Sequence, residues 1–150
     1  MNNDGLFDYI SWGGGNGGQK YRVYIRVNGP PWLISEVIDS IGWRHGAMDF
    51  VDWDDNGDMD FLAMGHFQPY SPAYQSVVFL NDGTAHFTPN VVTSTIEPLV
   101  NGSLDFVDLN NDGALELITI GFTSLSKGEK RSNIYQLQSG SYQPNSKRLC

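Results

Sequence analysis

The chain has 150 residues, of which 40% are hydrophobic and 13% aromatic, so its length and composition fit one folded domain and exclude a disordered tail. Its 17 acidic and 9 basic residues give a net charge of −8, and so acidic a surface repels a phosphate backbone, which argues against a nucleic-acid partner. No stretch approaches the roughly 20 apolar residues that a membrane helix needs, and the single cysteine, Cys150, excludes an internal disulfide framework.

The N-terminal segment begins inside a motif that recurs later in the chain. Asn2, Gly5, Asp8 and Gly13 have the same spacing as Asp54, Gly57, Asp60 and Gly65. The segment Met1–Gly5 has neither a basic region nor an apolar run, so a signal peptide is absent from this sequence. Either the protein is cytoplasmic or the sequence has lost its natural start, and the repeats favour the second alternative.

Short strands are predicted between the first and second copies of the motif. The glycine-rich run Gly13–Gly18 lacks the Lys-Ser/Thr pair of a phosphate-binding loop, and we expect a flexible connection there. A strand at Tyr24–Val27 runs into Asn28-Gly29, a strong hairpin signal because both residues tolerate positive φ. The segment Leu33–Ile38 is compatible with a turn or two of helix, but its place in the repeat favours a strand.

The two complete copies of the motif lie at 46–65 and 102–121, and identical residues recur 56 positions apart. The recurring residues of the first copy are Gly46, Asp49, Phe50, Val51, Asp52, Gly57 and Gly65. Each copy ends in a strand, Phe61–Met64 or Leu117–Ile120, whose successive apolar residues indicate burial on both faces.

The second half of each unit repeats more loosely. The strands Val77–Leu80 and Ile134–Leu137 run into turns at Asp82-Gly83 and Ser139-Gly140, and a last short strand follows, as at His86–Val92. Each unit of roughly fifty residues therefore indicates four strands. We predict an all-β domain of four-stranded antiparallel, propeller-type blades, arranged as an incomplete ring or an open array. The predicted units are a partial first repeat (1–42), a second (43–98) and a third (99–150).

The acidic loop after the first strand of each unit has the pattern D-x-D/N-x-D/N-G-x-x-D/E. Side-chain oxygens at positions one, three and five can converge on one point, position seven offers a backbone carbonyl, and the carboxylate at position nine closes the cage. Calcium takes about 6–8 oxygen ligands. The predicted ligands are Asp52, Asp54, Asn56, Asp58 and Asp60 in the second repeat, Asp108, Asn110, Asp112, Ala114 and Glu116 in the third, and Asn2, Asp4, Leu6 and Asp8 in the incomplete and weakest first set.

Alternatives to a calcium loop fit the residues less well. Magnesium prefers a near-octahedral site with several retained waters, and zinc prefers His or Cys ligands, which the loops lack. An EF-hand needs a Glu at position twelve, where Ala63 or Thr119 stands, and flanking helices. A single Asx-rich surface turn is the remaining alternative, and its repetition at blade spacing argues against it.

The sequences Asp52–Asp60, Asp108–Gly113 and Phe79–Phe87 resemble the FG-GAP/VCBS repeat family, which forms integrin-α-like calcium-binding propeller blades. The resemblance covers nearly the whole chain. It implies calcium in structural loops, an extracellular or cell-surface location, and adhesion through binding of glycans or proteins. The chain departs from the family in copy number, because such propellers close with several more blades than the repeats found here.

These observations favour an extracellular binding or scaffold module and not an enzyme. His45, His66 and His86 share no metal-ligand spacing, and nothing marks an activated nucleophile. The aromatic segment 66–74 suits either stacking on sugar rings or a self-packed loop. Because so few blades cannot close a ring, self-association or additional blades are expected. The alternative is an accessory propeller fragment of a secreted hydrolase or lyase.

Overall fold

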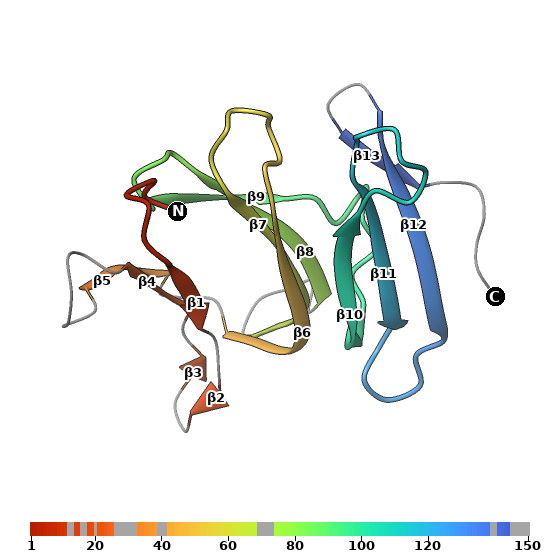
Figure 1. Cartoon of the computed structure of the whole chain (residues 1–150). Coiled ribbons are helices and arrows are strands. Elements are labelled where there is room, and N and C mark those ends of the chain that lie inside the picture. The colour runs from red at the N-terminus through yellow and green to blue at the C-terminus, as the bar shows by residue number, and fades with distance from the viewer. Residues whose placement is uncertain are drawn as a thin grey trace.

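The computed structural model describes the backbone of residues 1–11, 14–15, 18–19, 21–25, 33–38, 42–68, 74–138 and 141–144. All of these residues lie in strands, turns or irregular segments, and the prediction of an all-β fold is confirmed for them. None of them forms a helix that is long and apolar enough to cross a membrane. Two four-stranded antiparallel sheets lie side by side, and a smaller sheet lies on the N-terminal side of the pair (Figure 1).

Each of the two large sheets has its strands in the order of the chain. The first consists of β6 (Gly42–Val51), β7 (Asp60–Gln68), β8 (Tyr74–Asn81) and β9 (Phe87–Val91). The second consists of β10 (Val100–Val107), β11 (Glu116–Phe122), β12 (Lys130–Gln138) and β13 (Ser141–Pro144). The small sheet has the order β1 (Tyr9–Ser11), β4 (Tyr21–Ile25), β5 (Leu33–Ile38).

The structure confirms one local prediction and corrects two others. The segment Leu33–Ile38 is a strand, as its place in the repeat favoured. The glycine-rich run is not simply a flexible connection, because β2 (Gly14–Gly15) pairs with β3 (Gly18–Gln19). The predicted aromatic loop at 66–74 is shorter than expected, because His66 pairs across the sheet with Tyr74 and their ring centroids are 5.3 Å apart.

The structure describes one of the three hairpin turns that the sequence predicts. Strand pairing around Asp82-Gly83 resumes at Asn81 and Phe87, so a five-residue connection replaces the two-residue turn that the dipeptide signals. Gly83 there has a φ of 80°, which its lack of a side chain allows. The turns predicted at Asn28-Gly29 and Ser139-Gly140 lie outside the described residues.

The two large sheets share an irregularity in their first strands. The register shifts between Arg44 and Ala47 in β6, and again between Val100 and Ser103 in β10. At this β-bulge, Gly102 lies so close to the backbone of β11 that an added Cβ would clash with the carbonyl oxygen of Ile120, and Gly46 has the same relation to Met64. The preceding residues, His45 and Asn101, both have a left-handed φ, of 54° and 51°.

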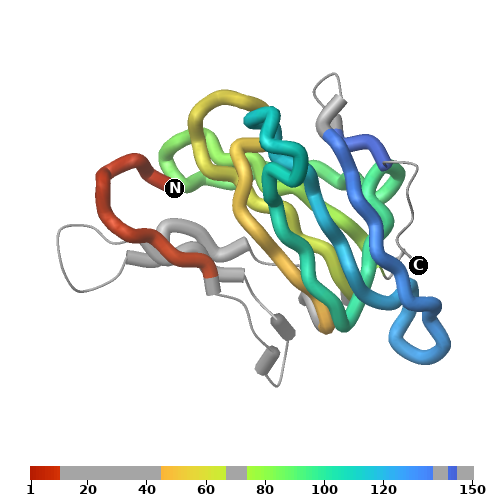
Figure 2. The backbone as a smooth tube through the Cα atoms, turned by 45° about the vertical axis from the view of Figure 1, so that its right-hand side comes forward, coloured from red at the N-terminus to blue at the C-terminus, as the bar shows by residue number. Residues whose placement is uncertain are grey.

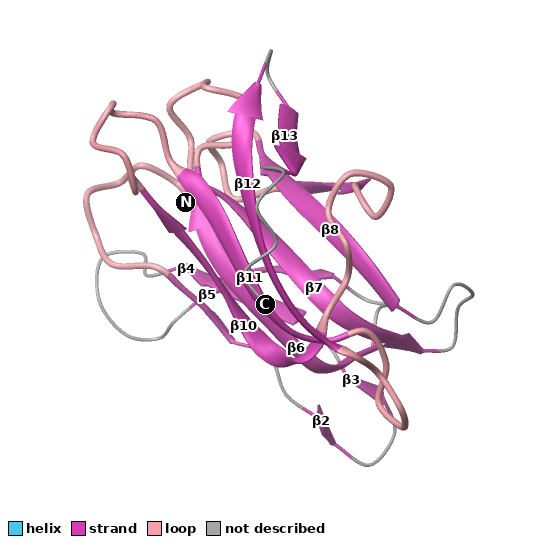
Figure 3. Ribbon diagram, turned by 90° about the vertical axis from the view of Figure 1, so that its right-hand side faces the viewer, coloured by secondary structure: helices cyan, strands magenta, loops and turns pink. Residues whose placement is uncertain are grey.

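The sheets stack through these first strands. Strands β6 and β10 run next to each other (Figure 2), and the strands of both sheets follow a similar direction when the stack is viewed from the β10–β13 side (Figure 3). A hydrogen bond joins them, because the backbone N–H of Phe106 donates to Oδ2 of Asp49 over 3.1 Å. The carboxylate of Asp49 therefore links one sheet to the next.

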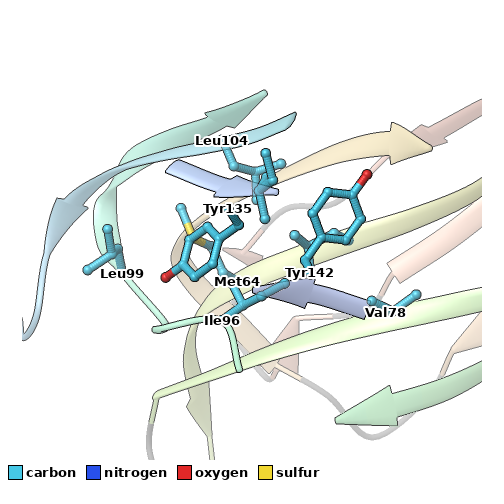
Figure 4. Close-up of a cluster of buried hydrophobic side chains, with 9 residues drawn as sticks. Met64, Val78, Ile96, Leu99, Leu104, Tyr135 and Tyr142 are labelled. Atoms are coloured by element: carbon cyan, nitrogen blue, oxygen red, sulfur yellow. The ribbon is translucent and has the colours of Figure 1, made fainter. Parts of the chain in front are cut away.

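Two apolar clusters occupy the two faces of the β6–β9 sheet. The cluster toward the N-terminal sheet contains Phe61, Ala63, Val77, Phe79, Ala85 and Phe87, with Met1 and Ile10 packed against it. The cluster toward the β10–β13 sheet contains Leu62, Met64, Val78, Ile96, Leu99, Leu104, Leu117, Tyr135 and Tyr142 (Figure 4). Burial of both faces explains why Phe61–Met64 is apolar at every position, as the sequence predicted.

The bulge glycine provides a test of this packing. We expect Gly102→Ala to destabilise the protein by roughly 1–3 kcal/mol, because the new Cβ forces the first two strands of the sheet apart. Urea denaturation followed by tryptophan fluorescence measures the change. Ser103→Ala, at the exposed neighbouring position, is the control and should leave the free energy of unfolding within about 0.5 kcal/mol. Equal stability of the two variants would contradict the close approach.

A buried tyrosine provides a second test. The hydroxyl of Tyr135, a residue only 2% exposed, accepts a hydrogen bond from the backbone N–H of Glu97 over 3.0 Å. Tyr135→Phe leaves that N–H unsatisfied and should cost roughly 1–3 kcal/mol in a chemical melt. Tyr74→Phe removes a bond of the same kind to an exposed N–H, that of Leu125, and should cost less than about 0.5 kcal/mol.

Candidate metal centre

The acidic loop of the second repeat connects β6 to β7. Its backbone turns sharply because Asp55 and Gly57 both adopt left-handed conformations, with φ of 59° and 89°. Glycine adopts this conformation freely, and Asp and Asn are the other residues most often found there. The same conformations recur at Asn111 and Gly113, with φ of 61° and 89°. The loop sequence thus sets the backbone path that directs its side chains inward.

Three predicted ligands of this loop come together. Asp52, Asp54 and Asp60 each offer one carboxylate oxygen, and these oxygens lie within 4.8 Å of one another. Asp52, which directly follows β6, is partly exposed, and Asp54 is exposed. Asp60, the first residue of β7, is fully buried. Among the described residues, this is the one group of three or more such side chains close enough to share an ion.

The buried carboxylate of Asp60 is held by two backbone donors. Its Oδ2 accepts the N–H of Trp53 over 2.8 Å, and its Oδ1 accepts the N–H of Asn81 over 2.7 Å. Burial nevertheless raises the pKa of Asp60, and the nearby carboxylates of Asp54 and Asp52 raise it further, against the lowering effect of the two hydrogen bonds. A cation between the three groups would compensate this charge.

The remaining oxygens of the loop stabilise its own backbone. Both carboxylate oxygens of Asp52 accept N–H groups, from Asn56 over 3.1 Å and from Gly57 over 2.9 Å. The side-chain oxygen of Asn56 accepts the N–H of Asp58 over 2.7 Å. The side chain of Asp58 points toward the first repeat, where it accepts a hydrogen bond of 2.6 Å from the side-chain amide of Asn3. The metal ligand predicted at this position is the backbone carbonyl oxygen of Asp58, and not its side chain.

The loop of the third repeat has the same backbone hydrogen bonds. Asp108 accepts the N–H groups of Asp112 and Gly113 over 3.2 and 2.9 Å, and Asp112 accepts that of Ala114 over 2.8 Å. Glu116 takes the part of Asp60 by accepting the N–H of Leu109 over 2.9 Å.

The third-repeat carboxylates do not gather as those of the second repeat do. The second carboxylate oxygen of Glu116, Oε1, accepts a hydrogen bond of 3.3 Å from the side-chain amide of Asn110. Two of the predicted ligands are therefore hydrogen-bonded to each other. The charge of Glu116, after the larger effect of burial, helps to raise the pKa of Tyr142 to about 12. Calcium binding by Asp108, Asn110, Asp112, Ala114 and Glu116 therefore stays a prediction, supported by the shared backbone bonds.

The first loop shows the same arrangement in shortened form. Asp4 accepts the N–H of Leu6 over 2.8 Å, and Asp8 accepts the N–H of Asn2 over 3.4 Å and forms an ion pair of 3.2 Å with the amino group of Met1. Its turn residues Asn3 and Gly5 also have positive φ, of 56° and 77°. The backbone path is therefore that of the other two loops.

One residue that sequence reasoning missed joins the first two loops. Asn81 is 3% exposed, and its side-chain amide donates to the carbonyl oxygens of Met1 over 2.8 Å and Met59 over 3.3 Å. Its side-chain oxygen accepts the N–H groups of Gly83 and Ala85 over 3.3 and 3.1 Å. The sequence signal was its position just before the Asp-Gly turn, but nothing in that signal indicates contact with another repeat.

Comparisons with known proteins identify no relative of this chain. No family model matches it, no curated protein is detectably similar in sequence, and no solved structure is detectably similar in fold.

The donors of the second loop fit a hard divalent cation. They are all oxygens, and one carboxylate oxygen from each of three aspartates lies within 4.8 Å of the others. Burial raises the pKa of Asp60, and the two neighbouring carboxylates raise it further. Cations of this class are bound by carboxylate and carbonyl oxygens. The arrangement could therefore hold an ion in the loop between β6 and β7.

Removal of the bridging amide tests how the loops are connected. Asn81→Ala deletes the hydrogen bonds of a buried side chain and leaves their partners unsatisfied, so we expect a loss of roughly 2–3 kcal/mol in the free energy of unfolding. Asn90→Ala, at an exposed position of β9, is the matched control and should change this free energy by less than about 0.5 kcal/mol. Comparable urea midpoints for the two variants would show that the link carries no stability.

Proposed function

We propose that this protein is a calcium-stabilised extracellular binding or scaffold module without catalytic activity. The observation that supports this most directly is the group of Asp52, Asp54 and Asp60 in a loop whose backbone bonds recur in the third repeat. An ion there neutralises a buried charge and fixes the connection between β6 and β7. In this proposal the ion has a structural role.

Calcium is the cation that the donor set favours. The loop offers only oxygen ligands, and it combines carboxylates with an amide oxygen and a carbonyl, which suits the larger and less rigid coordination shell of calcium. An extracellular location follows as part of the same proposal, because calcium is abundant outside the cell and loosely assembled sites of this kind bind it weakly.

The arrangement of the two large sheets supports a propeller-type stack as the finer architecture. Each sheet is a four-stranded meander, and first strand lies next to first strand where the sheets pack, as in neighbouring propeller blades. We propose that the three units are blades of the FG-GAP/VCBS kind in an incomplete ring or an open array. Glycans or extracellular proteins would bind to the loops or faces of such a scaffold.

Thermal melting with and without calcium tests the proposal. At a free calcium concentration about 100 times the dissociation constant, binding adds about 2.7 kcal/mol to the free energy of unfolding. For a chain of this length the melting temperature should therefore be roughly 5–10 °C higher in calcium than in chelator. Differential scanning calorimetry at several calcium concentrations measures the shift.

Two variants of the same loop show whether the effect comes from the predicted ligands. Asp54→Asn removes one of the three gathered carboxylates and should abolish most of the calcium-dependent shift. Asp55→Asn removes the same charge from the adjacent position, whose left-handed φ of 59° an asparagine also adopts at Asn111. It should retain the shift. A melt that does not respond to calcium in the unmodified protein would contradict the proposed function.

A further inference from the structure

The second half of the acidic loop in the second repeat is held from outside the loop. Asp58 and Asp60 supply the predicted ligands at positions seven and nine, a backbone carbonyl oxygen and a carboxylate. The backbone N–H of Asn81 donates to the carboxylate of Asp60 over 2.7 Å, and the side-chain amide of Asn81 donates to the carbonyl oxygen of Met59 over 3.3 Å. Because Asn81 is the last residue of β8, a neighbouring strand fixes two of these three successive residues.

The remaining residue of the three, Asp58, is held by the first loop. Its carboxylate accepts the hydrogen bond of 2.6 Å from the side-chain amide of Asn3, which is exposed and lies 55 positions earlier in the chain. The same carboxylate lies against the turn after β8, where a Cβ added to Gly83 would come within 2.7 Å of Oδ2 of Asp58. The bond between Asn3 and Asp58 therefore connects the first two loops directly.

The first half of the same loop is held only by the loop itself. In the part of the chain that the structure describes, the side-chain oxygens of Asp52 and Asn56 accept N–H groups of the loop, and the carboxylate of Asp54 accepts none. An ion that binds here has to bring the two halves of the loop together. Because contacts outside the loop already order the second half, less of this ordering cost remains for the ion to offset.

The third loop has the same turn but lacks the equivalent bond to the loop before it. Asn3, Asp55 and Asn111 occupy the same place in the three loops, and all have a left-handed φ, of 56°, 59° and 61°. Ala114 stands where the second loop has Asp58, and it has no side chain that could accept a hydrogen bond. Among the described residues, the side chain of Asn111 has no hydrogen-bond partner. The bond between loops is therefore specific to the first two loops, and Asn111 offers a matched comparison for Asn3.

We propose that Asn3 is a positioning residue for calcium binding by the second loop. Its bond to the carboxylate of Asp58 restricts the rotation of the residue whose carbonyl oxygen is a predicted ligand, so the first loop raises the calcium affinity of the second. Hydrogen bonds that orient metal ligands without touching the ion typically change metal affinity by roughly 10–100-fold. Because this bond is exposed, its effect lies near the lower end of that range. The proposal rests on the proposed function and makes the first loop part of the second site.

Isothermal titration of the full chain with calcium tests this. The titrations use a parent variant with Asp112→Asn and Glu116→Gln, in which the third loop has lost two carboxylates and the second loop gives the main signal. Asn3→Gly removes the side-chain amide and keeps a residue that adopts the left-handed φ freely. We expect it to raise the calcium dissociation constant about tenfold. Asn111→Gly makes the same change in the third loop and should leave that constant unchanged.

Substitutions of Asp58 show whether the effect passes through the bond. Asp58→Ala removes the carboxylate and keeps the backbone carbonyl, so adding Asn3→Gly should cause no further loss of affinity. Asp58→Asn removes the charge but keeps an oxygen that can accept the bond, so adding Asn3→Gly should still weaken binding. The two backgrounds thus separate the hydrogen bond from the loss of a negative charge near the ion. Thermal melts of Asn3→Gly and Asn111→Gly in chelator should be alike, which shows that the difference in affinity is not a loss of folding.

The possible outcomes are distinct. Equal calcium dissociation constants for Asn3→Gly and Asn111→Gly overturn the proposal. An equal loss of affinity on adding Asn3→Gly to Asp58→Ala also overturns it, because the effect then does not pass through the bond. Either result, with calcium still bound by the unmodified protein, leaves the proposed function intact. If the unmodified protein binds no calcium, the proposed function and the positioning role are both refuted.

Discussion

The structure depends on compensating one buried carboxylate. Asp60 lies where β7 leaves the acidic loop, it is fully buried, and its oxygens receive the N–H groups of Trp53 and Asn81. Two hydrogen bonds to a buried ionised group do not fully replace water, and the raised pKa of Asp60 reflects the remaining cost. The loop, the end of β8 and the first repeat all meet at this group through Asn81. A cation at this point would balance the charge of the three neighbouring carboxylates.

The residues that hold the acidic loops differ from the residues that pack neighbouring sheets together. The acidic loops connect the first two strands of each large sheet at one end, and one backbone hydrogen bond within the loop recurs in all three loops. The apolar faces and the bulged first strands hold neighbouring sheets together along their length. Because the two tasks use different residues, a substitution of a loop ligand need not disturb the packing of its sheet against the next.

Much of the fold follows from the sequence, and most of the rest depends on contacts between repeats. The recurring Asp and Gly residues predict the loops and the strands that follow them, because ligand spacing and positive φ are local properties. The length of β6, its bulge and the pairing of His66 with Tyr74 were not predictable, since they depend on packing against other strands. The role of Asn81 was missed for the same reason. In the third loop, the contact between Asn110 and Glu116 could not be inferred from a pattern that treats Asp and Glu as equivalent.

The consecutive pairing of strands has a consequence for how the chain acquires its structure. In both large sheets every strand pairs with its successor in the sequence, so most strand contacts close short loops and can form early. A sheet can assemble as soon as its own segment has left the ribosome, and it then offers a surface on which the next segment condenses. If folding advances from unit to unit in this way, the last sheet to form exposes an apolar face until the next sheet packs on it.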